Sequence, residues 1–428
     1  MENKFLLYKS FDKDRLLNNI RMLQDSFADE NQGESHQYQL CTTCAKLLIE
    51  NAVAYGLHGN LWHNYITLLL VKDENPFSLS CEKNNKAIGS LDQLAEYDLQ
   101  IIKSMFDLDL SAVLNDLPES VYQNLIHFTQ PQTVKSLLDD DILEHMIGLS
   151  QDLTMAENVE QFKQRLMQFY QNYGVGKIGL NKAFGIAAKN REVKIIPITN
   201  MAVVQLSDLV GYEIAKKKLV ANTESFIAGK KANNCLLFGD AGTGKSTSIK
   251  ALLNQYYDQG LRIIEIYKYQ YKELNAVISQ IKNRNYKFIL YMDDLSFEEF
   301  ETEYKYLKAI IEGGLQKKPD NVLIYATSNR RHLVKEMFSD KEGRRDQLHA
   351  SDTVQEKLSL AGRFGVTIFF CAPDKKEFQE IVRVLAEKHG IRMDEEKLLL
   401  EANKWELSHG GLSGRTAQQF IDYLAGSM

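Results

Sequence analysis

Proline, cysteine and long apolar runs are all scarce in this sequence. Six prolines and five cysteines occur among 428 residues, too few for a proline-rich linker protein or a scaffold held together by disulfides. No run reaches the roughly 18 apolar residues that a membrane helix needs, and the first residues do not form a signal peptide. We therefore expect a cytoplasmic protein that neither enters nor crosses a membrane by itself.

Charge is divided unequally between the two halves of the chain. Hydrophobic residues make up 44% and charged residues 25% of the sequence, as in a globular protein of two or three domains. Residues 1–200 carry 18 Lys and Arg against 26 Asp and Glu, whereas residues 201–428 carry 33 against 31. Because nucleic-acid affinity depends on cations that neutralise phosphates, we expect any polyanion contact in the second half.

The first 200 residues show the apolar spacing of helices. We expect an acidic, mostly helical N-terminal domain over residues 1–200. The glycine-rich segment 174–179, which precedes the apolar run 193–198, is interpreted as a linker into a second domain. The helical stripes cover residues 40–71, 91–106, 137–147 and 159–170.

Cys41-Thr-Thr-Cys44 is the one motif in this half with the spacing of a zinc or redox site. Its context argues against both functions. Cys81, His58 and His63 form no second ligand pair of comparable spacing. A thioredoxin-type motif follows a strand, whereas these two cysteines lie in a helical stripe. We interpret them as small buried apolar residues one helical turn apart.

A phosphate-binding loop lies in the second half, between a short apolar strand at 235–238 and a helical pattern at 247–256. Its sequence fits G-x-x-x-x-G-K-[ST]. Glycines let backbone N–H groups curl around phosphates at a helix N-terminus, Lys245 neutralises the β and γ oxygens, and the Ser246 hydroxyl ligates Mg²⁺. The expected cofactor-binding residues here are Gly239, Asp240, Ala241, Gly242, Thr243, Gly244, Lys245, Ser246 and Thr247.

Two adjacent carboxylates follow a second apolar strand, Phe288-Ile-Leu-Tyr-Met292. A parallel strand of this kind delivers its C-terminal carboxylates to the crevice where ligands of open α/β sheets bind. We expect Asp293 to be a Mg²⁺ partner, directly or through water. Asp294 is expected to orient and polarise the attacking water.

Polar and basic residues next to later elements continue this series. The strand 321–326 ends in Thr327-Ser-Asn329, which places an amide at the same edge of the sheet. Arg363, in Ala-Gly-Arg-Phe-Gly, directly precedes the strand 366–370, and Gly411-Leu-Ser-Gly-Arg415 opens the last helix. A single Asn or Arg residue is weak evidence of function. The order of these residues after a phosphate-binding loop is stronger evidence.

With these motifs, residues 206–424 resemble an AAA+ ATPase, and the whole chain is similar to an uncharacterised family of bacterial predicted AAA+ ATPases. The resemblance implies an α/β fold: a P-loop NTPase core of αβα layers over residues 201–372 and a small helical lid over residues 373–428. The mostly α-helical domain precedes both. ATP or ADP and Mg²⁺ are the implied cofactors.

The resemblance also implies roles for individual residues. Arg363 would act as an arginine finger in the site of an adjacent subunit, so a homo-oligomer is expected. The remaining matches are Val210, Gly211 and Tyr212 around adenine, residues 239–246 as Walker A, Asp293 and Asp294 as Walker B, Asn329 as sensor 1 and Arg415 as sensor 2.

Asp294 departs from the AAA+ pattern, in which Glu follows the Walker B Asp. Its side chain is one methylene shorter, and a small misplacement of the water costs much of the rate. The sequence therefore predicts an ATPase whose hydrolysis is slow.

Two further segments have patterns of charged residues that suit contact with nucleic acid or with another protein chain. Residues 266–272 alternate tyrosine and lysine, which fits either stacking on single-stranded nucleic acid or a half-buried edge strand entering a loop. Residues 330–345 mix arginine and lysine with acidic residues, the composition of a solvated loop that also suits contact with a partner or a neighbouring subunit.

Three functions are compatible with these residues. The first is an ATPase that remodels, assembles or regulates a protein partner, which the acidic N-terminal domain selects. The second is an initiator-like or loader ATPase that acts on nucleic acid or on a replication protein. The third is a nucleotide-dependent switch or scaffold that barely hydrolyses ATP.

Overall fold

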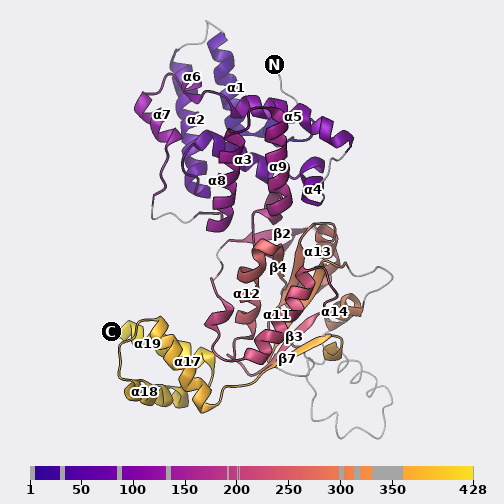
Figure 1. The fold of residues 1–428 in the computed structure, drawn as a ribbon, viewed down its shortest axis with the longest axis vertical. Helices are drawn as coiled ribbons and strands as arrows, with labels where there is room; N and C mark the ends of the chain where they lie inside the picture. The colour runs from indigo at the N-terminus through magenta and orange to yellow at the C-terminus, as the bar shows by residue number, and fades with distance from the viewer. Residues whose placement is uncertain are drawn as a thin grey trace. The chain divides into compact units, whose positions relative to one another are not determined.

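The chain divides into two compact units, Met1–Asn181 and Lys182–Met428. The computed structural model describes residues 5–28, 34–83, 89–131, 136–189, 192–199, 201, 203–297, 303–312, 319–329 and 360–427. Within these residues the first unit is helical and the second is built around a sheet (Figure 1).

Amphipathic helices form the first unit, as the apolar stripes predicted. Their cores include Trp62, Phe106, Phe162 and Tyr170, each at most 1% exposed. None of the helices in the described residues combines the length and hydrophobicity that a membrane span needs. The helices are α1 (Arg15–Ala28), α2 (Glu34–Tyr55), α3 (Leu61–Lys72), α4 (Pro76–Lys83), α5 (Ser90–Phe106), α6 (Leu110–Val113), α7 (Glu119–Ile126), α8 (Asp140–Thr154), α9 (Val159–Tyr173) and α10 (Gly176–Gly179), after a 3₁₀ turn at Phe11–Lys13.

Cys41 and Cys44 lie on α2 with their side chains buried and not in a disulfide. Burial raises the pKa of the Cys44 thiol to about 12, which disfavours the thiolate that metal binding and redox exchange require. Across the described part of the chain, no group of three or more His, Cys, Asp or Glu is arranged to hold a metal ion. The two cysteines therefore serve as core residues.

A seven-stranded sheet organises the second unit, in the order β2-β1-β4-β5-β6-β3-β7. Only the β1–β2 pair is antiparallel, so β3, β5, β6 and β7 end at the same edge. The strands are β1 (Ala183–Lys189), β2 (Glu192–Ile198), β3 (Cys235–Gly239), β4 (Leu261–Glu265), β5 (Lys287–Met292), β6 (Val322–Ser328) and β7 (Val366–Phe370).

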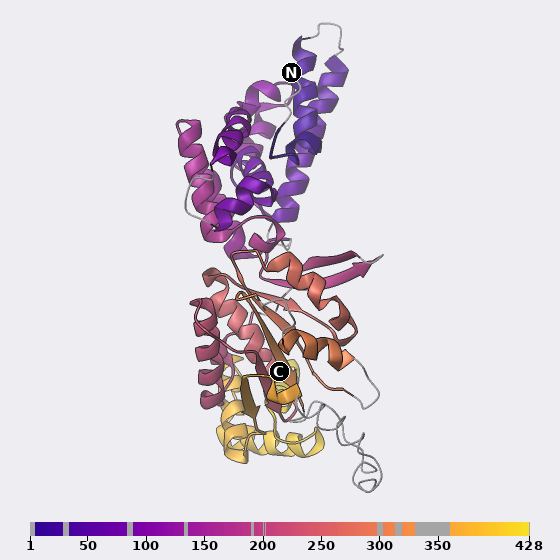
Figure 2. The ribbon, with the colours of Figure 1, turned by 90° about the vertical axis from the view of Figure 1, so that its right-hand side faces the viewer.

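Helices cover both faces of this sheet, which gives the expected αβα layers (Figure 2). On one face, α11 (Glu213–Ile227) and α12 (Lys245–Tyr256) pack onto the strands, and they share one apolar core with Leu237, Ile289 and Tyr325. On the other face lie α13 (Leu274–Ile281) and α14 (Glu303–Glu312).

The division between the units falls after Asn181, close to the glycine-rich segment 174–179 and earlier than residue 200, where we expected the N-terminal domain to end. Residues 176–179 of the segment interpreted as a linker form α10, and the apolar run 193–198 lies in β2 of the β1–β2 hairpin. β1 joins the sheet because it pairs in parallel with β4, with Ala183 opposite Ile263. A partner strand so distant in the sequence leaves no local signal.

The alternating segment 266–272 is not an edge strand. β4 ends at Glu265, and a 3₁₀ helix spans Lys268–Glu273. Gln270 determines this local structure, since its side chain accepts a hydrogen bond from the backbone N–H of Tyr267 (2.9 Å) and donates one to the carbonyl of Ile186 (3.0 Å). Tyr267 and Tyr269 are consequently exposed, with their rings parallel.

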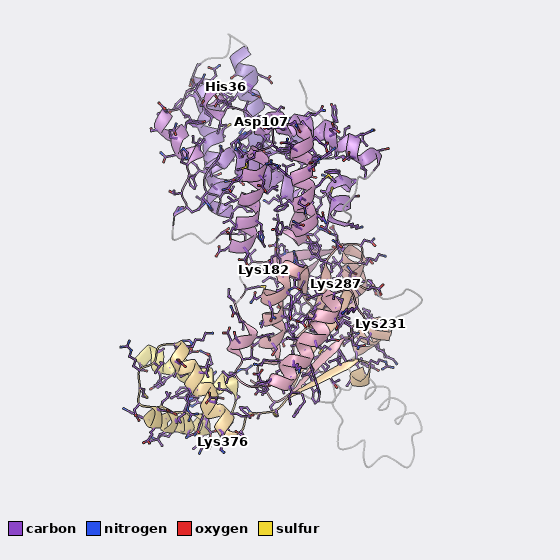
Figure 3. The ribbon with its side chains drawn as sticks, in the orientation of Figure 1. His36, Asp107, Lys182, Lys231, Lys287 and Lys376 are labelled. Carbon is purple, nitrogen blue, oxygen red and sulfur yellow. The ribbon has the colours of Figure 1, made fainter. Side chains whose placement is uncertain are left out.

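Three helices after β7 form a small C-terminal lid with its own apolar core. They are α17 (Lys375–Lys388), α18 (Glu395–Ser408) and α19 (Gly414–Ser427). A capping box between Asp374 and Glu377 starts α17. Figure 3 labels Lys376 on this lid and Lys287 at the first residue of β5, which lie at opposite ends of the second unit.

Candidate functional site

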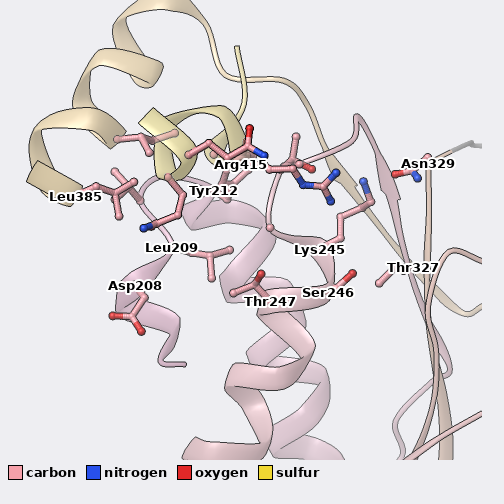
Figure 4. A pocket seen from close by; sticks show the side chains of 18 of the residues that line it. Asp208, Leu209, Tyr212, Lys245, Ser246, Thr247, Thr327, Asn329, Leu385 and Arg415 are labelled. Carbon is pink, nitrogen blue, oxygen red and sulfur yellow. The ribbon is translucent and has the colours of Figure 1, made fainter. Parts of the chain in front are cut away.

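A pocket of about 630 Å³ opens where the carboxyl edge of the sheet meets the lid, a volume in the range of small-molecule sites. Figure 4 shows its lining side chains. They come from the loop before α12, the ends of β5 and β6, the segment before α11, and the lid. The lining residues are Asp208, Leu209, Val210, Tyr212, Gly242, Thr243, Gly244, Lys245, Ser246, Thr247, Asp293, Asp294, Thr327, Asn329, Ile381, Leu385, Gly414, Arg415, Gln418 and Gln419.

The loop between β3 and α12 has a backbone path that only glycine permits at two positions. Gly239 has φ +137°, and a Cβ there would lie 2.0 Å from the carbonyl oxygen of Phe370. Gly244 has φ +87°, and its Cβ would meet Leu209 at 2.6 Å. The chain turns tightly from the strand into the helix, whose free N–H groups and dipole favour an anion.

Lys245 is the first residue of α12 and is 5% exposed. Its ammonium donates to the carbonyl oxygens of Gly239 (3.0 Å) and Asp240 (2.5 Å), so the side chain lies along the loop. Burial lowers the pKa of Lys245, although nearby carboxylates oppose this shift. A phosphate would supply the compensating negative charge.

Ser246 and Asp293 meet beside this lysine. The Ser246 hydroxyl donates to Oδ1 of Asp293 at 2.6 Å, and the Thr327 hydroxyl donates to the same oxygen at 2.5 Å. Burial raises the pKa of Asp293, but these hydrogen bonds outweigh it and leave the pKa below its ordinary value. A hydroxyl next to an ionised carboxylate is the kind of oxygen donor set that Mg²⁺ uses together with phosphate oxygens, so the residues fit this metal.

Asp294 is held in a left-handed backbone conformation with φ +49°. Its N–H donates to the Thr327 hydroxyl at 3.0 Å, and its Oδ1 accepts from the Asn329 amide at 2.9 Å. The next residue, Leu295, donates its N–H to the Thr327 carbonyl at 2.7 Å. The end of β6 therefore fixes the turn that carries both carboxylates.

Thr327 is a site residue that the sequence did not identify. Its hydroxyl joins Asp293 to the backbone of Asp294, and its side chain lines the pocket. The available signal was its place at the end of an apolar strand, two residues before Asn329. A threonine in a strand is too common for that place alone to reveal the contact.

The segment before α11 forms the apolar end of the pocket with the lid. Val210 packs against the core of the lid, and Tyr212 packs against the core of the sheet. The Tyr212 hydroxyl donates to the carbonyl of Cys371 at 3.1 Å, in the connection to the lid. Gly211 has φ +79° and contributes to the turn rather than to the lining. Ile381 and Leu385 of α17 complete this apolar wall.

Asp240 ties the phosphate-binding loop to the lid connection. Its carboxylate accepts from the N–H of Ala372 at 2.7 Å, and neither it nor Ala241 or Gly239 lines the pocket. Arg415, at the start of α19, donates its N–H to the carbonyl of Gly242 at 3.2 Å. Its side chain enters the pocket near Lys245 (Figure 4).

Arg363 lies away from this pocket. It precedes β7, whose first residue, Val366, pairs with Cys235 at the start of β3. β7 is five residues long, so roughly 16 Å of strand separates its beginning from the edge where the pocket lies. Arg363 is not among the residues that line the pocket of its own chain. The charged segment 330–345 lies outside the described residues.

Comparison with known proteins gives one family and a set of distant folds. The family described as "Protein of unknown function (DUF815)" matches residues 179–428. A search of curated proteins finds no match. The matched region contains the whole of the second unit, Lys182–Met428.

Among solved structures, the chain is similar to the RuvB Holliday junction branch migration motor of Thermotoga maritima, with 15% identity and a TM-score of 0.33 over 51% of this chain and 71% of that one. One substituted form of that protein gives the same values. Another gives 14% identity and a TM-score of 0.33 over 52% and 73%.

Proposed function

Since the chain belongs to the DUF815 family, whose description assigns no activity, we propose from its pocket that it is an AAA+ protein that binds ATP and hydrolyses it with Mg²⁺. One observation carries the proposal. A glycine-shaped loop, the buried Lys245 and the Ser246–Asp293 pair converge on one pocket from separate elements. Groups suited to binding a phosphate anion, a metal ion and a nucleobase therefore lie in one pocket.

In this proposal each residue acts on a defined part of the nucleotide. Leu209, Val210 and Tyr212 enclose adenine against the lid, and backbone N–H groups of the loop bind the β- and γ-phosphates with Lys245. Ser246 and Asp293 would hold Mg²⁺, which would supply positive charge to the phosphate oxygens.

The chemical step is assigned to the turn after β5. Asp294 accepts a hydrogen bond from the attacking water and polarises it, and Asn329 keeps that carboxylate in place. Arg415 approaches the γ-phosphate from the lid, so opening or closing of the lid alters the site. Because Asp294 is shorter than glutamate and already bonded to Asn329, we expect slow hydrolysis.

The position of Arg363 supports action between subunits. It precedes the strand that leads to the pocket edge, so a guanidinium there reaches a nucleotide only in a neighbouring chain. We propose a homo-oligomer in which Arg363 stabilises charge on the adjacent site. Hydrolysis then depends on assembly.

The N-terminal unit is proposed to bind the partner that the ATPase remodels, assembles or regulates. Its excess of acidic residues suits a protein surface better than a phosphate backbone. A loader that acts on nucleic acid is the second candidate, and the exposed, parallel rings of Tyr267 and Tyr269 favour it.

ATP hydrolysis by the full chain tests the proposal. Phosphate release that requires Mg²⁺ and disappears in Lys245→Ala is expected, and its absence at every protein concentration would overturn the ATPase assignment in favour of a nucleotide-dependent switch. Capture of a protein by Asp294→Asn in ATP supports the first role. Binding of single-stranded DNA or RNA at low salt only with ATP supports the loader instead.

A further inference from the structure

The hydroxyl of Tyr291 is buried next to the proposed Mg²⁺ site without a hydrogen-bond partner. Tyr291 is 2% exposed, and no atom among the described residues lies in hydrogen-bonding geometry with its hydroxyl. It stands on β5 two residues before Asp293, so the two side chains project from the same face of the strand. That face packs against α12, which begins with Lys245 and Ser246.

The groups near the Tyr291 hydroxyl include Ser246 and Asp293 of the proposed Mg²⁺ site. Burial raises the pKa of Tyr291 well above its ordinary value; the carboxylates of Asp293 and Glu265 raise it further, whereas the Ser246 hydroxyl lowers it. A phenol is protonated near neutral pH, since its ordinary pKa is about 10, so the hydroxyl acts as a hydrogen-bond donor. Its proximity also contributes to the lowered pKa of Asp293.

Neighbouring tyrosines of the same core have their hydroxyls satisfied. Tyr325, directly opposite Tyr291 on β6, is within 2.9 Å of both Asn222 and Thr223. Tyr256 donates to Glu224 at 3.0 Å. Both bond to α11, away from the pocket. Tyr291 alone of the three points at the Ser246–Asp293 pair, and a buried donor without an acceptor costs free energy.

We propose that Tyr291 is a positioning residue of the Mg²⁺ site, whose hydroxyl donates to a water ligand of the metal that Ser246 and Asp293 hold. The assignment rests on the proposed function. Its effect is on the metal, because a donor outside the direct ligands orients the water shell and tunes metal affinity. The affinity for ATP without Mg²⁺ does not depend on the Tyr291 hydroxyl.

Tyr291→Phe removes only the hydroxyl oxygen, and Tyr325→Phe is the matched control from the neighbouring strand. ATP affinity of the full chain is measured by calorimetry with Mg²⁺ and with EDTA. In Tyr291→Phe we expect the gain in affinity that Mg²⁺ confers to fall by about 10-fold, with affinity in EDTA unchanged. Tyr325→Phe is expected to keep the Mg²⁺ gain of the wild type and to unfold at a lower temperature.

Two results would overturn the proposal in distinguishable ways. A Mg²⁺ gain in Tyr291→Phe equal to that of the wild type would exclude the role of this hydroxyl and leave the proposed function intact. A wild-type chain that binds ATP neither with nor without Mg²⁺ would overturn the proposed function itself. If, with that unchanged gain, the ATP affinity of Tyr291→Phe falls equally in EDTA and in Mg²⁺, Tyr291 acts through packing rather than on the metal.

Discussion

The side-chain amide of Asn329 donates to Oδ1 of Asp294 at 2.9 Å, so a residue after β6 fixes the carboxylate that follows β5. The two residues are 35 positions apart in the sequence. Asp294 also has φ +49°, a conformation that Asp and Asn tolerate better than other non-glycine residues. The site therefore holds this carboxylate both through its backbone and through its side chain.

Asp294→Asn is predicted to retain ATP and to lose hydrolysis. Asparagine suits the same left-handed backbone, so the turn stays intact while the proton acceptor disappears. Loss of a positioned base costs about 100-fold or more in rate. Phosphate release and ATP affinity measured on the same preparation separate the two effects, and turnover equal to that of the wild type would remove Asp294 from the mechanism.

Thr327→Val is predicted to disturb both carboxylates at once. Valine keeps the shape of the side chain but leaves Asp293 and the N–H of Asp294 without the hydroxyl that joins them. We expect a loss of about 1–3 kcal/mol in the free energy of unfolding and weaker Mg²⁺-dependent ATP binding. Both quantities are followed by denaturant unfolding and calorimetry.

Thr223→Val is the control for this substitution. Thr223 is buried in the same unit, and its hydroxyl bonds to Leu219 and Tyr325, away from the pocket. It should lower stability without changing the Mg²⁺ dependence. If both variants change ATP binding equally, the effect of Thr327 is one of general stability.

Mixing two inactive variants tests the role of Arg363 in trans. Arg363→Ala has an intact pocket but no finger, whereas Lys245→Ala has a finger but no functional pocket. We expect each alone to hydrolyse ATP at least about 10-fold more slowly than the wild type. A mixture should recover activity, because Lys245→Ala subunits offer Arg363 to neighbours with an intact site. Arg363→Ala with full activity alone would contradict action between subunits.

The lowered pKa of Lys245 predicts weaker ATP binding at alkaline pH. The ammonium form binds phosphate, and burial makes the folded protein lose this proton at a lower pH than an exposed lysine does. ATP affinity should therefore begin to fall at a pH below the ordinary lysine pKa of about 10.4. Lys245→Arg keeps its charge throughout and serves as the reference, and parallel pH profiles of the two proteins would refute this titration.

Local sequence patterns predicted the strand–loop–helix that builds the phosphate site. The apolar run 235–238 is β3, and the strand expected at 366–370 is β7 with the same bounds. Such elements were predictable because glycine spacing and the short apolar runs are encoded next to each other. The helical N-terminal unit followed from the apolar periodicity, whereas the αβα layers were implied by the family resemblance of the motifs.

Contacts across the sheet could not be predicted in this way. β1 pairs with β4, Thr327 joins Asp293 to Asp294, and Tyr291 lies unpaired beside them. Each depends on strand order and on which face a side chain occupies. A single sequence does not record either, since a one-residue change of register reverses every face.

ATP binding to the full chain in the presence of Mg²⁺ is the most direct test of the central claim, that the pocket beside Lys245 is a nucleotide site. Calorimetry should give one ATP per chain for the wild type and for Lys218→Ala, which removes an exposed lysine from α11. Lys245→Ala should bind about 100-fold more weakly or not at all. Equal affinity in Lys245→Ala and the wild type, or no binding by a folded wild-type chain, would contradict the assignment.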